Sequence, residues 1–247
     1  MHHPPHTFIE DANNICTNCG AQFDTPYCGQ CGQQKSKRLQ MGTMFKTALN
    51  QFLHFEGGLL STIYHQFRKP GMVAGQYIKG RRKNWYNPIK YAFFSLTVYA
   101  LSVNFFKLNL HPHGMNDPNQ IKVFTFMFTY IQYAIFIVNI PLSWLMTKIF
   151  KGYNLTEIYI LGLYTFAGFG WIHLLFGALD LVGKPGGFIS MSLCDLLYTV
   201  VTICVFYGNR KAGTLFKGLL YFGLYRLCFM ILGSIVIMIV GLGPTSA

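Results

Sequence analysis

The sequence predicts an all-α membrane protein, with five transmembrane helices preceded by a small cysteine-rich ribbon and a cytoplasmic amphipathic helical segment. Three observations support this fold class. Only 11% of the 247 residues are charged, against about 25% in soluble domains. Five apolar runs have roughly the length that a bilayer requires of a helix. Four of the seven cysteines cluster in the polar N-terminal part, in two pairs with metal-ligand spacing.

The ribbon is expected at residues 15–34, after a segment, residues 1–14, that we expect to be disordered. The pattern Cys-x2-Cys-x8-Cys-x2-Cys is formed by Cys16, Cys19, Cys28 and Cys31. Two residues between paired thiolates let both sulfurs reach one ion, and two such pairs complete the tetrahedron that zinc prefers. The pattern therefore predicts one structural Zn²⁺ ion, whose binding supplies the folding free energy of this short segment.

Two alternatives remain for the same four cysteines. Disulfides would use all four thiols, but the charge distribution described below places the segment in a reducing compartment, where disulfides are rare. Iron in a rubredoxin-like site would use the same ligands. Zinc is the commoner ion in structural four-cysteine sites, so zinc is preferred.

Residues 41–89 form the predicted amphipathic interfacial region. Apolar side chains recur in it at helical spacing, at Phe45, Leu49, Phe52, Leu59, Ile63 and Phe67. Gly57 and Gly58 are expected to divide the pattern into two short helices. We interpret the segment as helix lying on the inner leaflet of the membrane. The alternative is a helix packed on the cytoplasmic ends of the bundle.

The last part of this region alternates basic and aromatic side chains directly before the first apolar run. The candidates for contact with lipid headgroups or the membrane interface are Lys79, Arg81, Arg82, Lys83, Trp85 and Tyr86. Lys and Arg attract anionic lipids, and Trp and Tyr suit the interface. RNA binding is an alternative for a basic strip behind a ribbon, but a strip tethered at the membrane plane favours lipid.

Residues 90–242 form the predicted transmembrane domain, and residues 243–247 form a short external tail. The apolar runs cover residues 91–106, 123–147, 158–179, 188–208 and 218–241. The first run has only 16 residues, but the lysines at its two ends can extend to the membrane surface. Each of the other runs is long enough to span a bilayer.

The basic residues indicate the direction of the chain across the membrane. If the N-terminus is cytoplasmic, sixteen of the 20 Lys and Arg residues lie in cytoplasmic segments and three in external loops. Cytoplasmic loops carry an excess of Lys and Arg, so the sequence predicts a cytoplasmic N-terminus and an external C-terminus. This topology accounts for most of the formal charge of +12, and no nucleic-acid partner is expected.

Two opposite charges lie inside apolar runs, where ionisable side chains are costly. From the rise of a helix, Asp195 lies about 10 Å deep and Arg226 about 12 Å from the same outer surface. The matched depths predict an Asp195–Arg226 ion pair in the membrane. His173 and Asp180 are candidates to join the pair in a polar pocket open to the outside. The alternative is a pair that only fixes helix register, with His173 as a buried core residue.

Short motifs in the first 95 residues carry a resemblance to a known family. They are Cys31-Gly32-Gln33, Pro70-Gly71, Tyr77-Ile78-Lys79-Gly80-Arg81-Arg82 and Tyr86-Asn87-Pro88. In these motifs the chain resembles an uncharacterised bacterial family of small multi-helix membrane proteins with an N-terminal four-cysteine zinc ribbon. The resemblance implies the bacterial inner membrane as the location, and it implies no particular activity.

Three classes of function are compatible with these features. A non-enzymatic scaffold or assembly factor would use the ribbon to dock a protein partner. A small transporter or channel, alone or as a homo-oligomer, would use the polar cluster of His173, Asp180, Asp195 and Arg226. An enzyme is disfavoured, because no acidic pair, histidine-rich metal motif or nucleophile constellation is present. The sequence favours the scaffold, with membrane lipids as further partners and the transporter or channel as the alternative.

Overall fold

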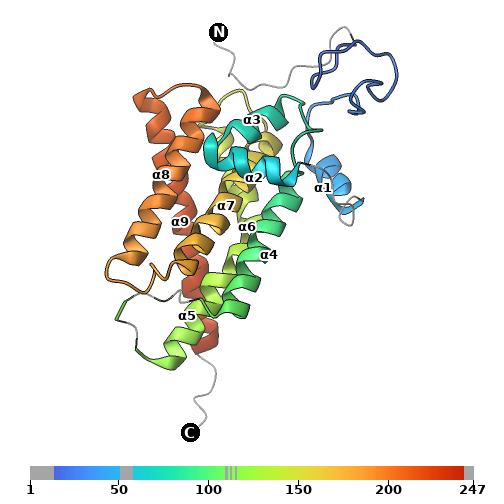
Figure 1. The fold of residues 1–247 in the computed structure, drawn as a ribbon. Helices are drawn as coiled ribbons and strands as arrows, with labels where there is room; N and C mark the ends of the chain where they lie inside the picture. Colours follow the sequence, from blue (N-terminus) through green and yellow to red (C-terminus); the bar gives the residue numbers. More distant parts are fainter. Residues whose placement is uncertain (1–13, 51–57, 109–110, 112, 115, 242–247) are drawn as a thin grey trace.

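The computed structural model describes residues 14–50, 58–108, 111, 113–114 and 116–241. Apart from Asn14, the predicted disordered segment and the predicted external tail lie outside the described residues. Figure 1 shows a bundle of long helices with the ribbon at one end, called the ribbon end below. The helices are α1 (Met41–Asn50), α2 (Leu59–Arg68), α3 (Met72–Ile78), α4 (Pro88–Phe106), α5 (Pro118–Tyr130), η1 (Ile131–Ala134), α6 (Ile135–Thr147), α7 (Leu155–Ala178), α8 (Gly187–Tyr207) and α9 (Ala212–Gly241).

The all-α fold class is confirmed over the described part of the chain. Five helical spans there are long and apolar enough to cross a membrane, and α5, η1 and α6 together form the second, Pro118–Thr147. The extended pairing found in the described residues consists of two isolated bridges in the ribbon, Ile15 with Gln22 and Tyr27 with Gln34. The protein is therefore a multi-pass membrane protein with a four-cysteine cluster at one end.

All five spans begin earlier than their apolar runs, and in three of them polar capping residues set the helix start. The Asn87 side chain, just before Pro88, accepts a hydrogen bond from the backbone N–H of Ile89. The Asp117 side chain accepts one from the backbone N–H of Asn119 in the same way. Asn154 and Glu157 form a reciprocal capping box at the start of α7. Caps of this kind satisfy backbone N–H groups that have no partner inside the helix. A count of apolar residues does not include them, so it places the helix starts too late.

Helix α7 is the core of the bundle: 78% of the residues in its most apolar 18-residue stretch are buried. Its glycines lie where neighbouring side chains come closest: Gly162 faces Asn139 and Tyr221, Gly168 faces the Tyr198 ring, and Gly170 faces the Ser95 hydroxyl. A Cβ at any of these positions would overlap its neighbour. Small residues of this kind let membrane helices approach closely.

Helices α2 and α3 pack across the ribbon end of the bundle (Figure 1), as the second interpretation of this segment proposed. On α2 the buried side chains are polar: Gln66 donates to the Tyr164 carbonyl oxygen at 2.9 Å, and Thr62 accepts from the Tyr86 N–H at 3.0 Å. The exposed side chains include Leu60, Tyr64 and Phe67. The face of α2 that packs on the bundle therefore carries Thr62 and Gln66 together with the partly buried Leu59 and Ile63, and large apolar side chains also point outward.

The Pro70-Gly71 turn fixes α2 and α3 against α8. Gly71 has a φ of +84°, and a Cβ there would overlap the carbonyl oxygen of Thr202 and lie 3.1 Å from its carbon. Only glycine adopts this conformation without strain and also leaves room for the neighbouring backbone. After the turn, Val73, Ala74 and Ile78 of α3 are fully buried.

Candidate metal centre and its attachment to the bundle

The ribbon consists of two knuckles with the same hydrogen-bond pattern. In the first, the N–H of Cys16 donates to Ala21 and the N–H of Gly20 donates to Cys16, both at 2.8 Å. In the second, Cys28 donates to Gln33 at 2.8 Å and Gly32 donates to Cys28 at 2.7 Å. Gly20 and Gly32 have φ values of +78° and +70°, which glycine adopts without strain. The repeat brings two thiols to each side of one centre.

All four cysteine sulfurs lie within 4.8 Å of one another. The Cys16–Cys31 and Cys19–Cys28 sulfur pairs are each 3.6 Å apart, much longer than a disulfide bond of about 2.05 Å, and all four cysteines are free. A tetrahedron with metal–sulfur bonds of about 2.3 Å has edges of about 3.8 Å. The donor set therefore fits one tetrahedral metal ion held by Cys16, Cys19, Cys28 and Cys31.

Backbone N–H groups favour the thiolate form of Cys28, whereas burial raises the pKa of Cys16 and, together with the neighbouring thiols, that of Cys19. The N–H of Cys31 donates to the sulfur of Cys28 and, against the opposing effect of burial, lowers the pKa of this thiol to about 7. A lower pKa means that less free energy is needed to deprotonate the ligand. With four protein ligands, the ion would have no open position for a substrate, as is typical of structural rather than catalytic sites.

Gln33 fastens the ribbon to the turn that follows α3. Its Nε2 donates to the Gly80 carbonyl oxygen at 2.9 Å and lies 2.8 Å from the Thr17 hydroxyl. Its Oε1 accepts from the backbone N–H groups of Arg82 at 3.0 Å and Lys83 at 3.2 Å. Gln33 is only 6% exposed, so both ends of a buried amide are satisfied across the junction. We call these contacts the Gln33 clamp.

Gly80 completes the clamp from the other side. It has a φ of +100°, and a Cβ there would lie 3.1 Å from the hydroxyl oxygens of Thr17 and Ser36. The clamp thus joins two of the motifs that carry the family resemblance, the Gly-Gln end of the ribbon and the Gly-Arg-Arg turn. The two motifs lie about 50 residues apart in the sequence, and the folded chain brings them into contact.

A second attachment joins the segment behind the ribbon to α7. The guanidinium of Arg38 forms two hydrogen bonds with the Glu157 carboxylate, at 3.1 and 3.2 Å. Glu157 is 1% exposed and also accepts from the N–H of Asn154 at 2.8 Å. Two parallel bonds fix the angle as well as the distance of the pair. Arg38 did not stand out in the sequence, and Gln33 stood out only as part of the Cys31-Gly32-Gln33 motif, because the partners of both residues lie far away along the chain.

The predicted lipid-contact strip is divided among different roles. Arg81 donates to the Thr17 carbonyl oxygen at 3.1 Å, and Arg82 donates to that of Lys37 at 2.8 Å, so both arginines contact the ribbon segment.

The other members of the strip lie at different depths. Burial and then the charge of Arg81 lower the pKa of Lys79. Tyr86 is buried, and its carbonyl oxygen accepts from the Tyr164 hydroxyl at 2.5 Å. Lys83 is exposed and Trp85 is half-buried. Contact of the strip with lipid headgroups stays a prediction.

Within the bundle, Asp195 contacts two basic side chains. Its Oδ2 lies 2.9 Å from His173 Nε2 and 3.8 Å from a terminal nitrogen of Arg226. Arg226 also donates to the Ser192 hydroxyl at 2.6 Å. Asp180 lies elsewhere: it is exposed in the turn after α7, with a φ of +50°. The structure therefore brings together three of the four predicted residues and leaves out Asp180.

Gln132, which had no distinguishing feature in the sequence, contacts His173 inside the bundle. The carbonyl oxygen of Phe128 can only accept, so the Gln132 group 3.0 Å from it must be the amide nitrogen. The same nitrogen lies 3.2 Å from His173 Nδ1, which must therefore accept. His173 then carries its proton on Nε2 and donates it to Asp195. The cluster consists of the His173 ring, between Gln132 and Asp195, and the Asp195–Arg226 ion pair.

The fold and this site define a class: multi-pass α-helical membrane proteins with a four-cysteine metal site at one end. Within it, residues 56–100 match a family described as "Protein of unknown function (DUF3667)". The matched residues contain the Pro70-Gly71 turn, the Gly80–Arg82 turn and the start of α4, and they do not contain the cysteines. Neither the curated proteins nor the solved structures gave a match.

Proposed function

We propose that the protein is a non-enzymatic docking scaffold or assembly factor of the bacterial inner membrane, with a zinc ribbon held in the cytoplasm for a protein partner. The observation that carries the proposal is the Gln33 clamp. Together with the Arg38–Glu157 pair it ties the ribbon to the bundle at two points, so a partner bound to the ribbon is held at a fixed position over the membrane. Zinc is the proposed ion because four thiolates form a closed structural site.

The outer surface of the ribbon offers a contact of defined chemistry. The side chains of Tyr27 and Ile15 are 57% and 43% exposed. Lys35 and Lys37 are also exposed, and they follow Gln34, whose backbone pairs with Tyr27. Exposed tyrosine is enriched among the residues that dominate protein interfaces. The partner that fits this surface has an apolar pocket for Tyr27 and acidic residues at its rim.

The experiment is affinity capture of the full chain from mild detergent, comparing wild type with Tyr27→Ala and Gln33→Ala. Gln30→Ala is the matched control, because Gln30 is exposed in the same knuckle. A partner held in fixed ratio by the wild type should be lost with Tyr27→Ala and weakened with Gln33→Ala, while the zinc content stays at one ion per chain. Equal capture by all variants would contradict the proposal.

A small transporter or channel is the second candidate, and one observation favours it. Asp195 Oδ1 and the Tyr99 hydroxyl are buried without a hydrogen-bond partner among the described residues, beside the His173 ring. Ionisable groups inside a helix bundle often mark the path of an ion or a proton. In liposomes this function requires an ion or proton flux that Asp195→Asn abolishes. Absence of flux from the wild type would exclude it.

A further inference from the structure

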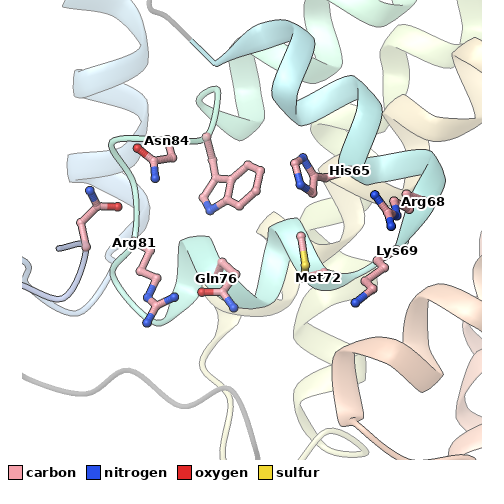
Figure 2. Close-up of a pocket in the computed structure, with 9 residues that line it drawn as sticks. His65, Arg68, Lys69, Met72, Gln76, Arg81 and Asn84 are labelled. Carbon is pink, nitrogen blue, oxygen red and sulfur yellow. The ribbon is translucent and has the colours of Figure 1, made fainter. Parts of the chain in front are cut away.

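A cavity of about 360 Å³ lies at the ribbon end between α2, α3 and the turn that follows α3. Figure 2 shows side chains from all three segments around it: His65 and Arg68 of α2, Met72 and Gln76 of α3, and Arg81 of the turn. Its remaining lining residues are Asn18, Lys69, Asn84 and Trp85. The size suits a small polar group rather than a protein segment.

The charge of the cavity is of one sign. Arg68, Lys69 and Arg81 line it, and none of its described lining residues is acidic. The amide oxygens of Asn18 and Gln76 are buried there, without a hydrogen-bond partner among the described residues. The cavity therefore combines cations that attract an anion with two amide oxygens that can only accept a hydrogen bond, for example from a hydroxyl group of the ligand. Guanidinium groups match the geometry of phosphate oxygens.

The lining is held in place by contacts within the protein. Arg81 is fixed by its bond to the Thr17 carbonyl oxygen. His65 Nδ1 donates to the Ser61 carbonyl oxygen at 2.8 Å, and its ring meets the Trp85 ring edge-on with centroids 5.2 Å apart. A ligand entering the cavity finds these groups already oriented, which lowers the entropic cost of binding.

The position of α2 brings the cavity close to the membrane interface. Its outward face carries Leu60, Tyr64 and Phe67, which are 80%, 55% and 49% exposed. Arg68, at the cavity, donates to the Tyr64 hydroxyl at 2.7 Å. An apolar helix face directed away from the bundle suits the headgroup–acyl boundary of a lipid leaflet.

We infer that this cavity binds a phosphate group, presented by an anionic lipid headgroup at the interface or by free phosphate in solution. Arg68, Lys69 and Arg81 bind the phosphate oxygens, and Trp85 and His65 form the wall beside it. The orientation of α2 favours the lipid as the source. The inference goes beyond the docking role and does not depend on it, because no residue of the exposed ribbon surface lines the cavity.

The test uses the full chain with zinc bound, in nanodiscs of phosphatidylcholine with or without phosphatidylglycerol. Native mass spectrometry counts the phosphatidylglycerol molecules retained by each chain. A second arm titrates inorganic phosphate against chloride in phosphatidylcholine nanodiscs and follows tryptophan fluorescence, with Trp85→Phe to identify the signal from the cavity. The first arm reports a headgroup and the second reports free phosphate.

The decisive variant is Arg68→Gln with Lys69→Gln. Its matched control is Lys151→Gln with Lys211→Gln, which removes the same charge from exposed positions in the α6–α7 and α8–α9 connections, at the ribbon end of the bundle (Figure 1). The cavity variant should bind its ligand about tenfold more weakly or worse, the size expected for losing charge-assisted bonds. The control should stay within about twofold, as expected for exposed charges away from the site.

The outcomes separate the sources and can overturn the inference. Loss of phosphatidylglycerol with the cavity variant identifies a headgroup site, and loss of the phosphate-dependent Trp85 signal identifies a site for free phosphate. If neither ligand binds the wild type, or if both double variants lose binding equally, the cavity is not a phosphate site. Equal thermal unfolding of the two double variants would show that both are folded.

Discussion

Gln33 and Gln34 are neighbours in the sequence with opposite environments. The Gln33 side chain is buried in the clamp, whereas the Gln34 side chain is exposed and only its backbone pairs with Tyr27. This contrast isolates the attachment of the ribbon from its folding. Replacing the side chain of Gln33 or of Gln34 leaves the four cysteine ligands in place.

We expect Gln33→Ala to loosen the ribbon without releasing its metal. The change leaves buried partners unsatisfied, such as the Gly80 carbonyl oxygen, at about 1–3 kcal/mol each. Hydrogen exchange at residues 79–83 should accelerate about tenfold or more, which corresponds to about 1.4 kcal/mol. Gln34→Ala should match the wild type, and equal protection in the two variants would rule out the clamp.

Asp195→Asn should destabilise the bundle. The change leaves Arg226 without its counter-charge, and breaking a buried pair costs about 3–5 kcal/mol. Because Arg226 is 28% exposed and also donates to Ser192, we expect the lower end of that range. Thermal unfolding in detergent measures the effect.

Neutralising both partners, with Asp195→Asn and Arg226→Gln, should recover part of the stability lost in the single variant. Exchanging the two charges would be a less informative test. It would place an arginine against the Nε2–H of His173, so two donors would face each other. If Asp195→Asn unfolds at the wild-type temperature, the pair contributes nothing to stability.

The side chains of the site were predictable only where chemistry imposes a spacing. The four cysteines follow from the geometry of a tetrahedral ion, and Asp195 and Arg226 follow from the cost of charge in lipid. Gln33, Arg38 and Gln132 have no such constraint on their position. Their roles depend on partners that only the folded chain brings near.

At the scale of elements, the turn at Gly71 determines where α2 and α3 sit. We expect Gly71→Ala to cost roughly 3 kcal/mol, from a positive φ at about 1–2 kcal/mol and an overlap with the α8 backbone at about 1–3 kcal/mol. Gly213→Ala is the control, since no atom lies within 4 Å of its Cβ position. It should be neutral or stabilising by up to about 1 kcal/mol. Thermal unfolding that ranks the two variants alike would contradict this reading of the turn.

Helix α2 shows the limit of periodicity as a guide to packing. The spacing of its apolar residues predicts a helix, and a helix is present. The spacing did not indicate which face of α2 is buried, because Thr62 and Gln66 form hydrogen bonds with α7, α8 and the segment before α4. In a membrane protein the outward side can be apolar as well, so polarity alone does not indicate which face is buried.

For the whole molecule, removal of the metal should unfold the ribbon and leave the bundle intact. Metal binding supplies about 10–16 kcal/mol to such sites, whereas the bundle has its own buried core around α7. A chelator should release one ion per chain and make residues 15–34 sensitive to protease, with little change in helical circular dichroism. A chain with Cys16 and Cys28 both changed to Ser should be sensitive without chelator. Unchanged protease resistance after the ion is released would contradict a structural role.

The topology across the membrane is a prediction for the whole chain. The α6–α7 and α8–α9 connections, which carry Lys151 and Arg210, lie at the ribbon end, and the α7–α8 connection, which carries Lys184, lies at the opposite end (Figure 1). This separation matches the sixteen-to-three distribution along the sequence and a cytoplasmic ribbon. A reporter that is active only outside the cytoplasm should be active when fused after Ala247 and silent when fused before the ribbon. The reverse pattern would invert the assignment.

Asn18 belongs to two structures at once: it lies in the first knuckle, between Cys16 and Cys19, and it lines the cavity beside α3. Metal and anion would therefore share a wall. Thermodynamic reciprocity requires that any factor by which the metal strengthens anion binding is also the factor by which the anion strengthens metal retention. A protein with this coupling would respond to zinc supply and to the anionic lipid of its leaflet as a single combined signal.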